Sequence, residues 1–152
     1  MASFYEPENI LIPRVVRDHL NTWQNKPVTI QAESAGKETP AMMMQQLASV
    51  EVKKRYINGS FVAAFNFAVY VAIDGEDTES RFDALAVLND LGIWLSETDD
   101  NGTFKNLPNL GDERKAIKVT MTSTPSLAAK LDNGVEEYQA LYELEYKYSP
   151  RR

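Results

Sequence analysis

Apolar side chains follow two different periods along the chain, and each period predicts a type of element. In the first segment they recur every three or four residues, the spacing of one helical face; they are Ile12, Val15, Val16, Leu20 and Trp23, with His19 beside them. Pro13 suits a first helical turn, where its missing amide hydrogen costs nothing, and Lys26-Pro27 ends the helix. The pattern predicts a helix over residues 13–24, followed by a short β-prone run at 28–31.

The next segment predicts a loop and then a tight hairpin. Residues 32–40 are rich in Ser, Gly, Thr and Pro, which indicates a mobile loop. Asn58-Gly59 favours a two-residue type I′ turn, because both turn positions need positive φ. Folding about this turn sets Tyr56 opposite Phe61, Val52 opposite Phe65 and Val50 opposite Phe67. The second strand continues to Ile73, and its other face carries the small residues Ala64, Ala68 and Ala72 with Tyr70.

A second helix and a long loop follow. The helix carries an apolar stripe of Phe82, Leu85, Leu88, Leu91 and Leu95, and Gly92 permits close packing on a sheet. Residues 99–111 predict a mobile loop with few apolar anchors, which orders on contact with a neighbouring subunit. Both loops are therefore candidate contact segments.

The last third of the chain predicts two strands. Residues 116–122 form the first, whereas Ser123–Leu131 fits either a helical turn or more strand. The final stretch alternates strictly, with Tyr138, Ala140, Tyr142, Leu144, Tyr146 and Tyr148 on one side and polar residues on the other. An amphipathic strand of this length belongs to an antiparallel sheet. We expect one α+β domain over residues 1–152, with an N-terminal helix and a central helix packed on one face of the sheet.

Composition narrows the chemistry. The 152 residues contain no cysteine and one histidine, and the net charge is −6. Thiol catalysis, thiolate zinc and disulfides are excluded, and a general binder of nucleic acid or of anionic membranes is disfavoured. No phosphate loop, dinucleotide motif or serine-nucleophile motif occurs. We expect a soluble protein with no enzymatic activity, cofactor or metal, and we assign the acidic clusters at 76–79 and 99–101 to helix capping and solubility.

Several residues are candidates for contacts between subunits or with partners. Lys53 and Arg55 fit a solvated strand edge or an intersubunit salt link, with Glu143 and the turn residues Asp99 and Asp100 as acidic candidates. Leu141 is an apolar residue on the polar face of the last strand, so it is either a subunit contact or covered by the first segment of the same chain. Met42, Met43 and Met44 form either an adaptable contact surface or core filling.

The order of these pieces resembles the minor capsid and tail-terminator proteins of long-tailed, siphovirus-type bacteriophages and prophages. The resemblance spans residues 40–148, and its pieces are PAMMMQQL, RYINGSFVAAFNFAVYV, FDALAVLNDLGIWL, NLPNL, KVTMTSTPSL and DNGVEEYQALYELEYKY. It implies a subunit without cofactor, assembled in the bacterial cytoplasm into a homo-oligomeric ring, expected to be a hexamer. In the virion this ring would cap the tail tube and meet the head connector, with DNA only as passing cargo and no membrane contact.

Two other classes stay open. One is a small soluble α+β domain, monomeric or dimeric, that binds a ligand in a pocket between the second helix and the sheet. The other is an enzyme that uses Tyr70, His19 or acidic residues. Measurement of the mass in solution by light scattering separates the ring from the ligand-binding domain.

Overall fold

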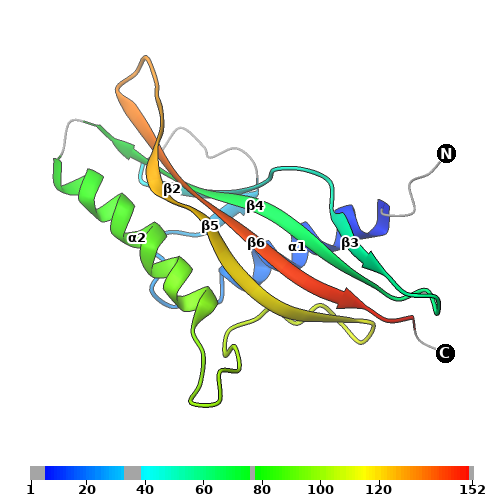
Figure 1. Cartoon of the computed structure of the whole chain (residues 1–152). Helices are drawn as coiled ribbons and strands as arrows, with labels where there is room; N and C mark the ends of the chain where they lie inside the picture. Colours follow the sequence, from blue (N-terminus) through cyan, green and yellow to red (C-terminus); the bar gives the residue numbers. More distant parts are fainter. Residues whose placement is uncertain (1–5, 33–38, 76–77, 151–152) are drawn as a thin grey trace.

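The computed structural model describes residues 6–32, 39–75 and 78–150 (Figure 1). The order of elements is α1 (Glu6–Leu20), β1 (Ile30–Ala32), β2 (Ala41–Gln46), β3 (Glu51–Arg55), β4 (Phe61–Asp74), α2 (Thr78–Ser96), β5 (Arg114–Lys130) and β6 (Val135–Tyr148). The mobile loop expected at residues 32–40 lies for the most part outside the described residues.

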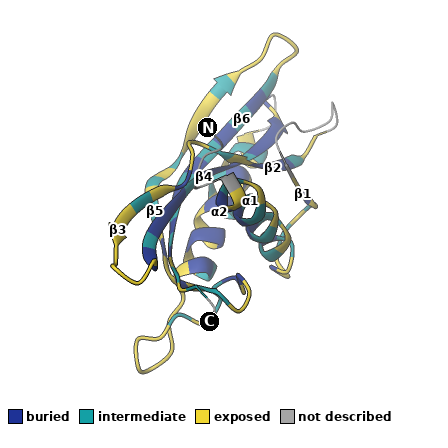
Figure 2. Cartoon of the chain, turned by 90° about the vertical axis from the view of Figure 1, so that its right-hand side faces the viewer, coloured by how far each residue is buried: buried dark blue, intermediate teal, exposed yellow. Residues whose placement is uncertain are grey.

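The strands form one six-stranded sheet in the order β1-β2-β4-β6-β5, and β3 pairs with the remaining part of β4. Only β1 and β2 run parallel; the other pairs are antiparallel. Helices α1 and α2 pack against the same face of this sheet (Figure 2). The predicted α+β class and the placement of both helices are confirmed.

The core lies between the helices and one face of the two central strands, β4 and β6. Strand β4 pairs with β6 along its whole length of 14 residues. Alternate side chains of both strands point to the helices, and Phe65, Phe67, Tyr142 and Tyr146 are fully buried there. The rings of Phe67 and Tyr142, which face each other in the ladder, lie 5.4 Å apart. The period of two in the sequence therefore identified the covered face correctly.

Helix α1 begins earlier than the sequence predicts. It starts at Glu6 and ends at Leu20, so Pro13 lies inside the helix rather than in its first turn. A proline in a helix interior costs about 3 kcal/mol. Burying one large aliphatic side chain returns about 1.5–3 kcal/mol, and Ile12, Val16 and Leu20 are all buried on the sheet. Packing therefore outweighs the local preference of Pro13.

The predicted two-residue turn and its register are wrong. The amide of Gly59 donates to the carbonyl of Tyr56, and the amide of Tyr56 donates to the carbonyl of Ser60, which makes a three-residue loop. Gly59 has a φ of 90°, so it is the position that requires glycine. A shift in register between Val52 and Lys54 then places Val52 opposite Ala63 instead of Phe65. A bulge of this kind leaves no signal in the alternation of the sequence.

Strand β5 settles the open question about residues 123–131. It extends from Arg114 to Lys130 as an edge strand, so this segment is strand and not helix. Pro125 lies within it, and four register shifts interrupt its pairing with β6. Prolines and bulges are typical of edge strands, where a lost ladder hydrogen bond is least costly.

Most of the apolar stripe predicted for helix α2 is buried, and the close packing predicted at Gly92 is present. Leu88, Leu91 and Leu95 are buried, but Phe82 is 62% exposed, because it lies on the first turns beyond the covered part of the stripe. A Cβ atom at Gly92 would collide with the side chain of Met121 and lie 3.4 Å from the ring of Tyr142. Glycine at this position therefore lets α2 approach the sheet closely.

Candidate interaction surface

The face of the sheet opposite the helices is not covered by any described element. It carries the side chains that alternate with the core, and the small residues of β4 form its floor: Ala64, Ala68 and Ala72. Leu141 lies next to Ala68 and Ser123 in the ladder and is half-buried. Met43 and Tyr70 pair with each other on the same face. The described part of the first segment, α1, packs on the other face, so it does not cover Leu141.

An ion-pair network joins β3 and β6 across β4 on this open face. The Nζ atom of Lys53 lies 2.9 Å from a carboxylate oxygen of Glu143 and 3.6 Å from one of Glu145. The hydrogen bond that Lys53 donates to Glu143 raises the pKa of Lys53 above its ordinary value. Lys53 and Glu143, two of the predicted contact residues, are thus brought together within one chain. An intersubunit salt link is not needed to neutralise Lys53.

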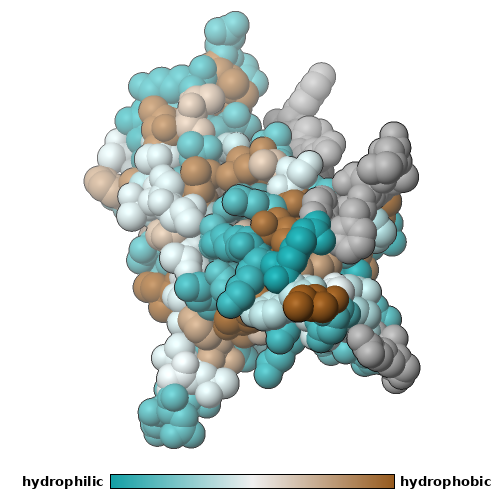
Figure 3. Space-filling view, turned by 45° about the vertical axis from the view of Figure 1, so that its right-hand side comes forward, coloured by the Kyte–Doolittle hydropathy of each residue, from teal (hydrophilic) through white to brown (hydrophobic). Residues whose placement is uncertain are grey.

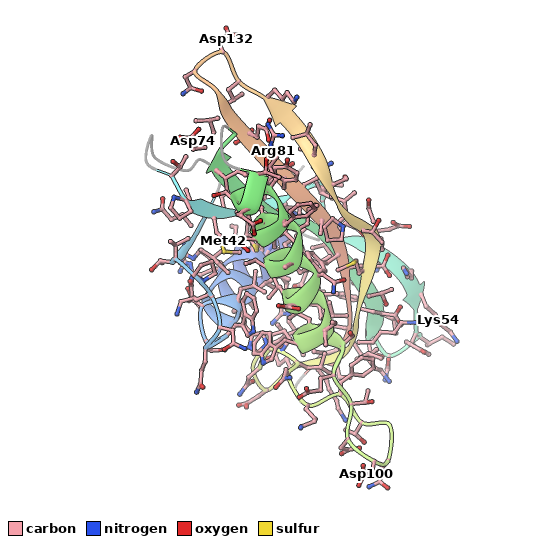
Figure 4. All side chains as sticks on the ribbon, turned by 90° about the vertical axis from the view of Figure 1, so that its left-hand side faces the viewer. Met42, Lys54, Asp74, Arg81, Asp100 and Asp132 are labelled. Carbon is pink, nitrogen blue, oxygen red and sulfur yellow. The ribbon has the colours of Figure 1, made fainter. Side chains whose placement is uncertain are left out.

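The methionine run contributes to both faces of the sheet. Met42, Met43 and Met44 lie in β2 and are all buried. Met42 and Met44 belong to the core under the helices, whereas Met43 faces the other side of the sheet. Figure 4 shows Met42 beneath α2. Of the two alternatives, core filling is therefore confirmed for Met42 and Met44, because their side chains lie between the sheet and the helices.

The segment after α2 is anchored, contrary to the prediction of a loop with few anchors. The amides of Asn101 and Thr103 donate to the carboxylate of Asp99 at 2.8 and 3.0 Å. A bridge between Thr98 and Phe104 closes a small hairpin, and Leu110 is buried in the core further along. Asp99 therefore stabilises the turn itself, and Asp100 is exposed at its tip, at the lower end of the molecule in Figure 4.

His19 links α1 to this segment. Its Nε2 atom lies 2.6 Å from the carbonyl oxygen of Asn106, and its ring stacks on Trp94 with a centroid separation of 5.1 Å. Because a carbonyl only accepts hydrogen bonds, Nε2 carries the proton of the neutral ring. Burial lowers the pKa of His19 below 6.5, so this neutral form is favoured. His19 therefore has a structural role: it joins α1 to Trp94 of α2 and to the segment around Asn106.

Two buried carboxylates fix the long strands to the helices at opposite ends of the sheet. Near the start of β5, Arg114 donates two hydrogen bonds to Glu8 of α1, at 2.8 and 2.6 Å, and the hydroxyl of Tyr146 donates to the same carboxylate. Near the β5–β6 turn, Arg81 of α2 donates to Glu136 at 2.9 and 3.1 Å. Both ends are therefore rigidly placed relative to the core.

A pocket of about 550 Å³ opens between the small hairpin after α2 and the paired ends of β5 and β6. It is lined mainly by apolar groups, with two lysines from the strands; the lining residues are Gly102, Thr103, Phe104, Leu107, Lys115, Ala116, Ile117, Lys147 and Ser149. The sequence did not predict this pocket. It depends on the register that sets Lys115 opposite Lys147. The space between α2 and the sheet, where a ligand pocket was a possibility, is occupied by buried leucines and Tyr142.

Within residues 6–32, 39–75 and 78–150, no group of three His, Asp or Glu side chains is placed to hold a metal ion. No helix in that part of the chain has the length and apolarity needed to cross a membrane. No family model matches the chain, and no curated protein matches it.

Proposed function

We propose that this chain is a structural virion protein: a ring-forming tail terminator that caps the tail tube of a long-tailed phage and meets the head connector. The proposal places it at the head-proximal end of the tail, with no enzymatic role. Its sequence support is the resemblance over residues 40–148, which extends from β2 to the end of β6.

The observation that carries the proposal is the open face of the sheet. Apolar side chains at Leu141 and Tyr70 lie there among charged residues and are only partly buried. A mixed apolar and polar surface of this kind is typical of interfaces between subunits that also exist separately. In Figure 3, apolar and polar side chains are likewise interspersed over the face in view.

The test is the oligomeric state of the purified chain. Light scattering and negative-stain electron microscopy should detect a closed ring, formed by the chain alone or on addition of tail tubes. Leu141→Glu should abolish the ring, because it introduces a charge into a partly buried contact. Ile93→Glu is the matched control, since Ile93 is also apolar and 57% exposed but lies on α2. This control should leave the ring intact.

Two results would contradict the proposal at different levels. A ring that survives Leu141→Glu excludes the open face as its contact. In a phage that encodes the chain, deletion of the gene should give tails of irregular length that do not join heads. Tails of uniform length that still join heads would exclude the terminator role.

A further inference from the structure

The pocket beside the small hairpin combines an apolar lining with two like charges. Phe104, Leu107 and Ile117 supply apolar surface, and Lys115 and Lys147 are the charged residues of its lining. Ile117 is 38% exposed although it is a large aliphatic residue. The pocket therefore suits a segment that presents an apolar side chain next to an acidic one.

The two lysines lack an acidic partner in the described part of the chain. They are direct neighbours in the β5–β6 ladder. Cross-strand neighbours of like charge destabilise a sheet. Lys147 instead lies 5.0 Å from the ring centroid of Tyr56, and none of the ion pairs of the described residues involves either lysine. An anion bound between them would relieve this repulsion.

The opposite end of the molecule carries the complementary chemistry. At the tip of the β5–β6 hairpin, Leu131 is 44% exposed and Asp132 follows it directly. Figure 4 places Asp132 at one end of the molecule and Asp100, beside the pocket, at the other. Polar and apolar surface lie side by side at this tip, at the top of Figure 3.

The tip is held in a fixed conformation. The amide of Leu131 donates to the carbonyl of Val135 at 2.8 Å, and the amide of Gly75 donates to the carbonyl of Gly134 at 3.0 Å. Below it, Glu136 binds Arg81 and also accepts a hydrogen bond from the hydroxyl of Tyr138 at 2.9 Å. A rigid projection loses little conformational entropy when it binds.

We propose that the hairpin tip of one copy of this chain inserts into the lysine-lined pocket of a second copy. Leu131 contacts the apolar lining, and the carboxylate of Asp132 lies between Lys115 and Lys147. Because tip and pocket are on opposite ends, the contact is heterologous and each copy uses both of its ends. Repeated contacts of this kind close into a ring only if the proposed function holds. The contact between two copies does not depend on that function.

Cross-linking of introduced cysteines tests the contact directly, because the chain contains no cysteine. The variant carries Asp132→Cys and Lys115→Cys. A lysine ammonium beside a carboxylate leaves the two Cβ atoms too far apart for a disulfide, so a short flexible bismaleimide is used to join the two thiols. Val135 and Lys147, near these positions, are 12 residues apart on β6, which corresponds to about 40 Å, so a link within one chain is impossible. The cross-linker should give a ladder of covalent multimers on a denaturing gel. The control, Asp132→Cys with the exposed helix position Asn89→Cys, should give no ladder.

Charge reversal provides an independent measurement. Asp132→Lys should weaken self-association by more than about tenfold, because like charges would face each other. Adding Lys115→Glu and Lys147→Glu to the same chain should restore self-association, because opposite charges then face each other again. All these positions are exposed, so circular dichroism should show an unchanged fold.

The outcomes separate this contact from the proposed function. Absence of a ladder from the cysteine variant overturns the contact, whether the unmodified chain is a monomer or a ring; a ring without the ladder leaves the terminator role standing. A ladder, together with recovery of self-association in the triple charge-reversal variant, supports the contact. This holds even if the phage deletion excludes tail termination. Equal ladders from the variant and its control also overturn the contact.

Discussion

The two faces of this sheet are built from the same strands but have opposite consequences for the molecule. Toward the helices, β4 and β6 place large aromatic side chains such as Phe67 and Tyr142, both without exposed surface. On the other side, the next residues along the same strands are Ala68 and Glu143. The first face carries the large apolar side chains of the core, whereas the second combines buried alanines with polar and apolar side chains that are only partly buried.

This difference shows that neighbouring residues of one strand meet different requirements: one must fit a packed core, and the next must fit the opposite surface of the sheet. A change on the helix side leaves a cavity, because a close-packed core cannot relax fully around it. A change at a partly exposed position of the open side, such as Gln139, leaves no such cavity. Substitutions in neighbouring positions should therefore separate stability from assembly, and the following predictions test that separation in order of decreasing effect.

The largest effect is expected at Phe67. Phe67→Ala should lower the free energy of unfolding by about 3–5 kcal/mol, because the ring is fully buried and packs between Phe65 and Tyr142. Urea denaturation followed by tryptophan fluorescence measures this change. Gln139→Ala on the open face is the control and should cost less than about 0.5 kcal/mol. Similar losses for the two variants would show that the faces are not energetically distinct.

The next effect is expected at Arg114, which neutralises a buried carboxylate on the covered side. Arg114→Gln should cost about 3 kcal/mol, because Glu8 is left buried without its cationic partner. Adding Glu8→Gln should return part of this loss, since the uncompensated charge is then removed. A double variant less stable than the single one in urea would show that charge compensation is not the cause.

His19 should make the covered side sensitive to pH. Since burial lowers the pKa of folded His19, the unfolded chain binds the proton first as the pH falls. The contribution of the neutral ring is complete above the ordinary pKa of about 6.5 and is lost as the pH decreases through the folded pKa. His19→Phe keeps a ring against Trp94 and should flatten the dependence of the urea midpoint between pH 5 and 7. Parallel curves for the two chains would contradict this assignment.

The smallest effect is expected at Lys53 on the open face. Lys53→Ala removes exposed ion pairs with Glu143 and Glu145 and should cost no more than about 1 kcal/mol. Moderate salt should screen most of this difference. A loss as large as that of Arg114→Gln, or one unaffected by salt, would mean that the network is not solvated as the structure indicates.

Much of the fold was predictable from the sequence because alternation reports burial directly. The tyrosine face of the last strand and the leucine stripe of α2 were identified in this way. Register was not predictable, since the bulge between Val52 and Lys54 changes the pairing without changing the residue pattern. The anchors of residues 97–111 are hydrogen bonds that His19 and Asn106 donate and that the carboxylate of Asp99 accepts. Polar side chains in a loop do not reveal from the sequence whether they bind water or the protein.

The candidate contact residues were less predictable than the fold. Leu141 was found because an apolar residue interrupted a polar face, which is a local signal. The pocket depends on Lys115 and Lys147 meeting across a ladder, and they are 32 positions apart in the sequence. Such pairs become visible only once strand order and register are known.

The interrupted edge of the sheet has a consequence for how association is controlled. Pro125 and the four register shifts of β5 leave no uninterrupted row of backbone groups for a further strand to copy. Backbone pairing responds weakly to ionic strength, whereas contacts between lysines and carboxylates respond strongly. The proposed contact between Asp132 and the two lysines should therefore weaken as salt is added, whereas pairing along the sheet edge would not.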